Sequence, residues 1–514
     1  MFLIYAVFIF LILQSTLIAQ APDMAWFRAQ GTDTEEHVHE GMQTSDGGYI
    51  AIGHGVESSG SDDMLIIKVS ETGWFQWKQE FGTSGKKGAG YCITEVSNGF
   101  IAGGAIFDPD SQRTQRFLAK LDLDGEVVWE KFYGSDGAGG IRGIDVTEDG
   151  NIIVTGYKNT PNISEFQGYA FIVDDGEGFI MKLDLDGEII WEKSIDAPQG
   201  TKVREIDQGF AVCSCVWVWS EETGDHQDFS LIKTDIEGNT IWQEYYGGIQ
   251  NDHLYDFDLT DDGGYILAGH TLSYGVRNWD YLLIKVDSNG EEEWHKTFGQ
   301  PRGYDANWIH DESYGVRQTT DGGFVITGGS GDEYEYSDSG HPSGPSDEWK
   351  VYVVRTDGNG NLLWEVIYPG WSTGNNSGEF IGLTNDGGYI IFVDTDSKTP
   401  PEPNNFGFLK TKPDPVSVLR DEIIGNPGKF ELKQNYPNPF NPRTIINYEL
   451  PITNDVDLSI YSLTGQKVIK LVNESQRAGI HQIVWDASGF PSGIYIVQLK
   501  QGPYADTSKI VLIK

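Results

Sequence analysis

The chain has 514 residues, a formal net charge of -41, 64 glycines and 12% aromatic residues. A surface this acidic repels polyanions, which excludes nucleic-acid binding and binding to anionic membranes. The length allows two or three domains, and the three cysteines at positions 92, 213 and 215 supply no disulfide framework.

The first segment of the chain is apolar from Phe2 to Leu13 and ends in Ala19-Gln20-Ala21, a small-x-small cleavage pattern. This pattern predicts a signal peptide over residues 1–21, cut between Ala19 and Pro22. No Lys or Arg precedes the apolar run, so an uncleaved anchor is the alternative interpretation. No later segment is apolar enough to span a membrane, and the mature protein is expected to have no transmembrane segment.

A motif then repeats along the chain: Lys or Arg, four residues, Gly, three residues, Trp. It occurs six times with constant internal spacing, at Lys68/Gly73/Trp77, Lys120/Gly125/Trp129, Lys182/Gly187/Trp191, Lys233/Gly238/Trp242, Lys285/Gly290/Trp294 and Arg355/Gly360/Trp364. The gaps between motifs vary. A constant unit with variable gaps indicates a structural module joined by tolerant loops.

A second element accompanies each motif: a glycine turn followed by an apolar run. It occurs seven times, at residues 45–54, 97–105, 148–157, 207–215, 261–270, 320–329 and 385–394. Asp-Gly and Asn-Gly between apolar runs are strong hairpin signals. Two hairpins per repeat give four strands, and four strands in roughly 40–50 residues is the period of a β-propeller blade.

The seventh turn has no tryptophan strand after it, whereas the segment 25–31 contains Trp26 with a Gly five residues later, as several motif strands do. The sequence therefore predicts an all-β fold: a seven-bladed β-propeller over residues 22–413, whose N-terminal strand closes the last blade. Each motif Trp is expected to dock on the neighbouring blade. The rival interpretation makes Asp122, Asp124 and Glu126 calcium ligands. An EF-hand loop also needs Glu at its twelfth position, where this chain has Tyr133.

Candidate ligand-binding residues lie in or beside the loops of the fourth to seventh repeats. Two insertions, 159–177 in the third repeat and 330–348 in the sixth, lengthen the connection between the second and third strands, and long loops on a regular scaffold are often functional. Outside the motifs, aromatic rings with nearby carboxylates suit sugar binding. These candidates are Trp217, Trp219, Trp279, Trp308, Trp349, Trp371, Asp280 and Asp305. The alternative is that the tryptophans cap the core.

Signals for catalysis or metal binding are weak. The sequence contains no Gly-x-Ser-x-Gly elbow, P-loop or His-Glu-x-x-His motif. His37 and His39 share one face of a strand and could hold a metal with Glu35 or Glu40, but this signal is weak and a solvated loop is the preferred interpretation. We expect no cofactor and no bound metal. Among 77 acidic residues, the sequence singles out no catalytic pair.

The composition changes after residue 413, where residues 414–428 are predicted to form a linker. Residues 429–514 contain short alternating strands, which predict a small Ig-like β-sandwich. This tail resembles the type A C-terminal sorting domain of type IX secretion, found in Bacteroidota. The matching stretches are QNYPNPFNP, IYSLTGQKV, AGIHQIVWD and SGIYIVQL; the motif residues are Asn435, Tyr436, Pro437, Asn438, Pro439, Phe440, Gly465, Gly493 and Tyr495.

The resemblance implies transfer through the periplasm and recognition by the type IX secretion machinery, with the mature protein released or attached to the cell surface. The repeat KLDLDGEVVW is also similar to that of pyrroloquinoline-quinone propellers. Those enzymes usually have eight blades and a vicinal disulfide, whereas Ser214 separates Cys213 from Cys215 here, so the quinone is not carried over.

The sequence favours a secreted or surface-attached monomeric propeller that binds an extracellular glycan or another surface protein. The first alternative is a propeller-type glycan-cleaving enzyme, hydrolase or lyase; the second is an adhesive or structural module. A buried carboxylate pair would favour the enzyme, an open aromatic groove would favour glycan binding, and a flat polar face would favour adhesion.

Overall fold

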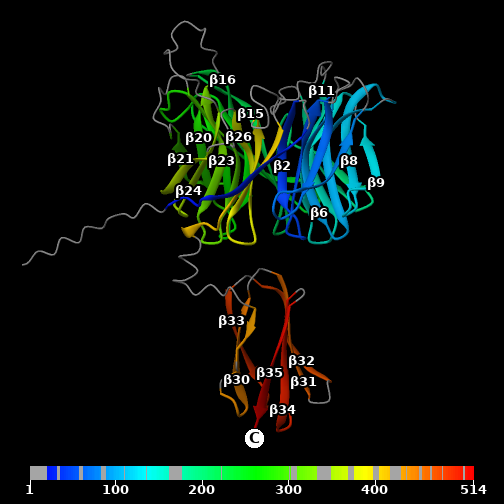
Figure 1. Ribbon diagram of the computed structural model, residues 1–514, viewed down its shortest axis with the longest axis vertical. Coiled ribbons are helices and arrows are strands. Elements are labelled where there is room, and N and C mark those ends of the chain that lie inside the picture. The colour runs from blue at the N-terminus through cyan, green and yellow to red at the C-terminus, as the bar shows by residue number, and fades with distance from the viewer. Residues whose placement is uncertain are drawn as a thin grey trace, which may run out of the picture. The chain divides into compact units, whose positions relative to one another are not determined.

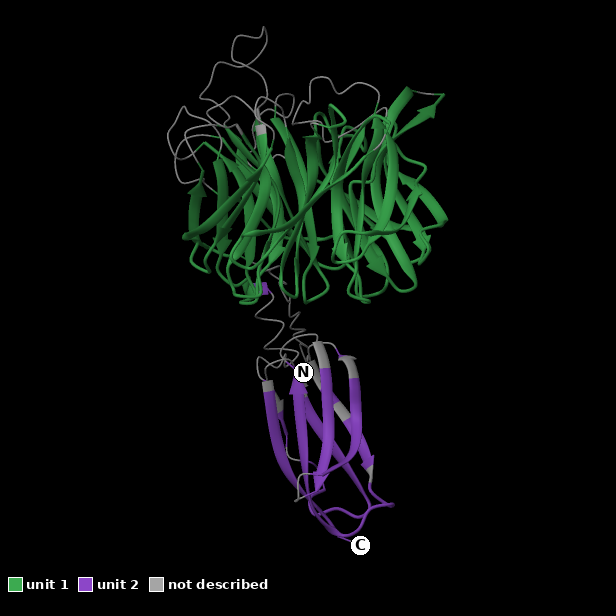
Figure 2. Ribbon diagram, turned by 90° about the vertical axis from the view of Figure 1, so that its right-hand side faces the viewer, with its two compact units in different colours: residues 1–415 green, residues 416–514 purple. Residues whose placement is uncertain are grey.

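The computed structural model divides the chain into two compact units, Met1–Pro415 and Val416–Lys514 (Figures 1 and 2). It describes residues 20–31, 35–56, 62–82, 88–108, 110–134, 136–160, 176–221, 223–299, 301, 309–332, 349–368, 375–396, 405–416, 430–433, 435, 437–450, 454–462, 466–476, 479–501 and 504–513.

In its described residues the first unit consists of four-stranded antiparallel sheets, each built from consecutive strands. The first three sheets contain β2 (Glu36–Gln43), β3 (Tyr49–Val56), β4 (Asp62–Val69) and β5 (Phe75–Phe81); β6 (Ala89–Val96), β7 (Gly99–Asp108), β8 (Arg113–Leu121) and β9 (Val127–Tyr133); and β10 (Ala138–Val146), β11 (Ile152–Thr160), β12 (Glu177–Leu183) and β13 (Ile189–Ser194).

The next three sheets follow the same order. They contain β14 (Lys202–Ile206), β15 (Gly209–Ser220), β16 (Gly224–Asp235) and β17 (Thr240–Tyr246); β18 (Asp252–Leu259), β19 (Tyr265–Thr271), β20 (Asp280–Val286) and β21 (Glu292–Phe298); and β22 (Ile309–Gln318), β23 (Phe324–Asp332), β24 (Lys350–Thr356) and β25 (Leu362–Tyr368).

The last sheet of this unit joins the two ends of the repeat array. It contains β26 (Asn376–Leu383), β27 (Tyr389–Thr395), β28 (Asn405–Thr411) and, at its outer edge, β1 (Met24–Gln30). β1 runs antiparallel to β28, with Phe27 opposite Leu409. The segment containing Trp26 therefore supplies the outer strand that the seventh turn lacks, as the sequence predicts.

The first strand of each sheet is the inner one. Each packs beside the first strand of the next sheet, from β2 through β6, β10, β14, β18 and β22 to β26, and β26 packs beside β2. The sheets thus form a closed ring around a central channel, which is the arrangement of a β-propeller. This confirms the predicted all-β propeller fold.

Five of the six motif tryptophans dock on the turn glycine of the next sheet, whereas Trp364 contacts Tyr389 and Asp414 of the last sheet. A methyl group on Gly125 would stand 2.6 Å from the Trp77 ring, and the same closeness recurs for Gly187 with Trp129 and Gly238 with Trp191. Trp26 of β1 docks on Gly73 in the same way, across the point of closure. These glycines have φ between 75° and 86°, a region that disfavours a side chain. The predicted docking role of the tryptophans is confirmed.

The motif aspartate and lysine are also structural. Asp122 Oδ1 accepts the backbone N–H groups of Asp124 and Glu126 at 2.9 Å each, so this carboxylate closes the hairpin turn rather than opening a calcium loop. Four of the motif cations, and Lys410 at the corresponding place in the last sheet, pair with the aspartate of the glycine turn in their own sheet. Lys120 and Lys233 instead donate to the backbone carbonyls of Leu185 and Ser288. The ion pairs are Lys68–Asp46 (2.9 Å), Lys182–Asp149 (2.7 Å), Lys285–Asp262 (3.0 Å), Arg355–Asp321 (2.5 Å) and Lys410–Asp386 (2.9 Å). A buried cation requires such a partner.

The second unit has two sheets in its described residues. One orders β29 (Glu431–Leu432), β30 (Arg443–Leu450) and β33 (Gly479–Asp486); the other orders β32 (Lys467–Gln476), β31 (Asn454–Ser462), β34 (Gly493–Gln501) and β35 (Tyr504–Leu512). Trp485 is 1% exposed and lies in one apolar core with residues of both sheets, including Tyr448, Leu458 and Leu499. This unit has its own core, separate from those of the ring.

Replacing Trp77 by Ala should lower the free energy of unfolding by about 2–3 kcal/mol, because a half-buried indole is removed from its contact with Gly125 and the core around Phe100. Chemical denaturation followed by circular dichroism measures the change. Trp219→Ala is the matched control, since that ring is 68% exposed and its loss should change stability by less than about 0.5 kcal/mol. Equal effects of the two substitutions would contradict the docking role.

Candidate functional site

A groove between two neighbouring sheets of the ring is lined by two exposed tryptophans. Trp217 and Trp219 lie on β15 and are 48% and 68% exposed. Residues two apart on a strand point to the same side, so the two indoles stand next to each other. The groove has a volume of ≈ 660 Å³, and its other walls include Tyr245, Glu177 and residues 195–198.

The tryptophans are exposed because their hairpin is longer than its sheet. β15 and β16 have 12 residues each, whereas β19 and β20 in the next sheet have 7. The pairing continues from Gly209 opposite Asp235 to Ser220 opposite Gly224. The first eight residues of β15 are buried, and the last four extend beyond the sheet, where nothing covers their side chains completely.

Two further predicted tryptophans lie elsewhere and cover their own sheets. The ring centre of Trp279 lies 4.5 Å from that of His253 and 4.8 Å from that of His270, and its backbone carbonyl accepts the Asp311 N–H at 2.8 Å. Trp349 packs on Gly329 and Gly331 of β23, where a methyl group would stand 2.5 Å from it.

The remaining predicted residues divide into two sets. Asp280 is half-buried at the start of β20, where its carboxylate occupies the space beside Gly299. Trp308, Trp371 and Asp305 lie outside the described residues. The described part of the chain therefore brings Trp217 and Trp219 into one groove and places Trp279 and Asp280 in the next sheet.

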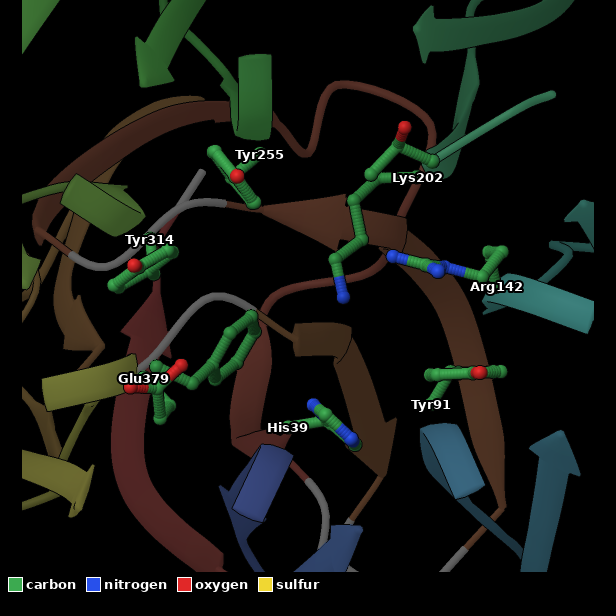
Figure 3. Close-up of a pocket in the computed structure, with 9 residues that line it drawn as sticks. His39, Tyr91, Arg142, Lys202, Tyr255, Tyr314 and Glu379 are labelled. Atoms are coloured by element: carbon green, nitrogen blue, oxygen red, sulfur yellow. The ribbon is translucent and has the colours of Figure 1, made fainter. Parts of the chain in front are cut away.

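The central channel holds a ring of polar side chains that sequence reasoning missed. Six of the inner strands carry a β-bulge, and in each the bulged residue lines one small cavity: His39, Tyr91, Arg142, Tyr255, Tyr314 and Glu379. A bulge re-aims the side chain of its extra residue. β14 has no bulge and contributes Lys202, its first residue. Figure 3 shows these side chains converging from different strands.

The charges of this ring are linked across the channel. The Lys202 ammonium forms an ion pair with Glu40 of β2, and the Arg142 guanidinium lies over the Tyr91 ring at 4.4 Å. Burial, then the Asp394 charge, raises the pKa of the Glu379 carboxyl, which disfavours its charged form. Burial, then the charges of His54 and Arg142, lowers the pKa of His39, so its imidazole is neutral.

His54 of β3 and His270 of β19 occupy matching places, opposite His37 and His253 respectively. Their ring contacts differ: His54 Nδ1 lies 3.0 Å from His39 Nε2, whereas His270 Nε2 lies 3.2 Å from His253 Nδ1. His37 instead contacts Asp394 at 2.7 Å and Glu35 at 3.2 Å. His37 and His39 thus turn to different partners. Within the described residues, no group of three His, Cys, Asp or Glu side chains is arranged to hold a metal ion.

In the second unit, the predicted sorting-motif residues support the tail's own fold. Asn435 Nδ2 donates to the Pro437 carbonyl at 3.0 Å and to Thr444 Oγ1 at 2.8 Å. Asn438 Oδ1 accepts the Val511 N–H at 2.9 Å, and the Phe440 and Tyr495 rings pack on Trp485 at 5.5 Å each. Gly493 and Pro439 are exposed, whereas Tyr436 and Gly465 lie outside the described residues.

Comparison with known families decides the nature of the tail. Residues 434–514 match the family described as secretion system C-terminal sorting domain. The tail is a sorting domain of the type IX secretion system. The domain directs the protein to the cell surface or to the outside, which confirms the predicted localisation. No helix among the described residues is long and apolar enough to cross a membrane.

No curated protein matches the sequence. Similar solved structures include the Pan2 WD40 domain of Neurospora crassa, with 11% identity, 77% of this chain and 97% of that chain covered, and a TM-score of 0.47. The propeller domain of the Trilobed protease from Pyrococcus furiosus is 11% identical; the match covers 74% of this chain and 94% of that chain, with a TM-score of 0.40. PorZ of Porphyromonas gingivalis, a surface component of the type IX secretion system, is 10% identical; the match covers 93% of this chain and 82% of that chain, with a TM-score of 0.27. The propeller description rests on this chain's own strand pairing.

The His37 network makes stability depend on pH. Burial alone would lower the pKa of His37, but Asp394 and Glu35 outweigh it and raise the pKa from 6.5 to about 10. The protonated imidazole therefore stabilises the fold fully below pH 6.5, and this contribution is lost as the pH rises toward 10.

We expect the melting temperature of His37→Gln to fall furthest below that of the parent protein at low pH. The difference in melting temperature should shrink steadily as the pH rises from 6.5 to about 10, as thermal melts at several pH values would show. His295→Gln, at a half-exposed site beside Glu292, is the control, and its melting temperature should follow that of the parent protein at every pH. A parent–variant difference that stays constant across the interval would rule out the raised pKa.

Proposed function

We propose that this chain is a secreted, monomeric seven-bladed propeller that binds an extracellular glycan through the Trp217–Trp219 groove. In this proposal residues 1–21 are a signal peptide, residues 22–413 form the propeller, and residues 414–428 lead to an Ig-like sorting domain at 429–514. The sorting domain carries the protein out of the cell, released or attached to the surface, and the propeller acts there.

The observation that carries the proposal is the pair of exposed indoles in one groove. Large aromatic side chains are usually substantially buried, and an exposed apolar cluster in a concavity marks an interaction site. The groove volume of ≈ 660 Å³ falls in the usual range for small-ligand sites. The apolar face of a pyranose ring stacks on an indole, and Glu177 with Asp196 supplies acceptors for sugar hydroxyls.

The acidic groups of the groove favour binding over cleavage. Glycoside hydrolysis needs one carboxylic acid whose pKa is raised, so that it can protonate the leaving oxygen. Hydrogen bonds from Ser194 and Asn159 instead lower the pKa of Glu177. A glycan-cleaving propeller is therefore the second candidate, and an acid–base pair elsewhere would be required for it.

A glycan-array screen of the chain from Pro22 onward tests the proposal. Trp217→Ala and Trp219→Ala should each weaken binding to any glycan found by at least about tenfold, or about 1.4 kcal/mol, because each removes a stacking surface. Trp74→Ala, which removes a 63% exposed indole from a turn of another sheet, is the matched control and should bind normally.

Three results would overturn this assignment. Glycan binding that survives both groove substitutions would place the site elsewhere. Release of new reducing ends from bound glycans would identify an enzyme. A complete absence of glycan binding would leave a protein partner as the ligand.

Sorting is tested separately. Deleting residues 430–514 should trap the protein in the periplasm of the native host, because the sorting domain is what the secretion machinery recognises. Immunoblots of periplasmic, surface and medium fractions measure the distribution. Unchanged export of the shortened chain would contradict the assigned role of the tail.

A further inference from the structure

The cavity at the centre of the ring is small, buried and built from residues that the folding of separate sheets brings together. Its volume is ≈ 30 Å³, the share of liquid volume that about one water molecule occupies. A sugar cannot enter such a space, whereas a water molecule or a monatomic ion fits. The cavity is therefore separate from the groove of the proposed function.

Donors of hydrogen bonds converge on one side of this cavity. Arg142, Thr201 and Lys202 line it from β10 and the start of β14, and all three residues are at most 7% exposed. A guanidinium offers five N–H donors and an ammonium three. The Thr201 hydroxyl oxygen is buried and has no hydrogen-bond partner among the described residues. A buried hydroxyl that has no partner and belongs to a cavity-lining residue indicates an occupant that it contacts.

The opposite side is mainly aromatic. Tyr255, Tyr314 and Phe380 line it together with Glu379, whose pKa is raised by burial so that its charged form is disfavoured. The Tyr314 hydroxyl donates to Glu312 outside the cavity. Aromatic ring edges are electropositive and tolerate an anion. A metal cation would be repelled by Arg142 and Lys202.

We propose that the central cavity binds one small inorganic anion of halide size, held by Arg142, Lys202 and Thr201. The anion joins strands of different sheets, so that its binding stabilises the closed ring. A second cavity of ≈ 480 Å³ adjoins this site and is lined by Arg204 and Arg317 and by the carboxylates Glu40, Glu95 and Asp145. Phe380 lines both cavities, with Lys202 Nζ 5.1 Å and Arg317 Cζ 4.4 Å from its ring centre. Its side chain therefore stands between the site and solvent.

The first test is thermal unfolding of the full chain in sodium chloride, with sodium gluconate holding the ionic strength constant because gluconate is too large for the cavity. A ligand that binds only the folded state raises the melting temperature along a saturating curve. We expect saturation with chloride and with bromide. Thr201→Val should shift the midpoint to several-fold higher chloride, and Arg142→Gln should remove the dependence. Lys412→Gln, at an exposed cation, should leave it unchanged.

The second test does not depend on any variant. Crystals of the parent protein soaked in sodium bromide should show an anomalous scattering peak in the cavity beside Arg142, Thr201 and Lys202. A melting temperature that rises without saturation, and equally in Arg142→Gln, would overturn the proposal. So would a cavity that holds only water in the bromide-soaked crystal. Neither result bears on glycan binding by the groove.

Discussion

Closure of the ring is the constraint on which the rest of the structure depends. Each four-stranded sheet is too small to hide both faces, so the motif tryptophans are covered by the next sheet, five of them by its turn glycine and Trp364 by Tyr389 and Asp414. An open array would expose one sheet edge and leave one docking position empty. β1 removes both problems, since it pairs with β28 and places Trp26 on Gly73. At the same junction Asp414, fully buried, pairs with Arg355 and accepts the Trp364 indole N–H.

The closed ring separates two kinds of place where ligands could be held. On the outside, the long β15–β16 hairpin extends beyond its sheet and exposes Trp217 and Trp219, which form an accessible groove. At the centre, bulges in inner strands aim single polar residues into a cavity of ≈ 30 Å³. Size assigns the ligands: the groove accommodates a sugar-sized molecule, and the cavity accommodates a water molecule or an ion.

Sequence reasoning succeeded where a physical requirement repeats. The motif spacing is constant because a motif Trp must reach the equivalent place in the next sheet, which is a turn glycine for all but Trp364. Trp26 was recognisable because a Gly follows it by five residues, as in several motif strands. The sequence also identified Trp217 and Trp219 as tryptophans without a docking role. It could not separate them from Trp279, because whether an indole is covered depends on how far its hairpin extends and on His253 and His270 beside it. The channel ring was missed because a bulge shifts the alternation of side chains, and no local pattern reports the shift.

Hydrogen exchange of the backbone amides of β1 tests the closed ring most directly. If the N-terminal strand completes the last sheet, the amides of residues 24–30 that pair with β28 should exchange as slowly as those of β27 and β28, through the same opening event. Fast exchange of β1 beside well-protected β27 and β28 would show that the ring is open. It would contradict the account of both the channel and the docked tryptophans.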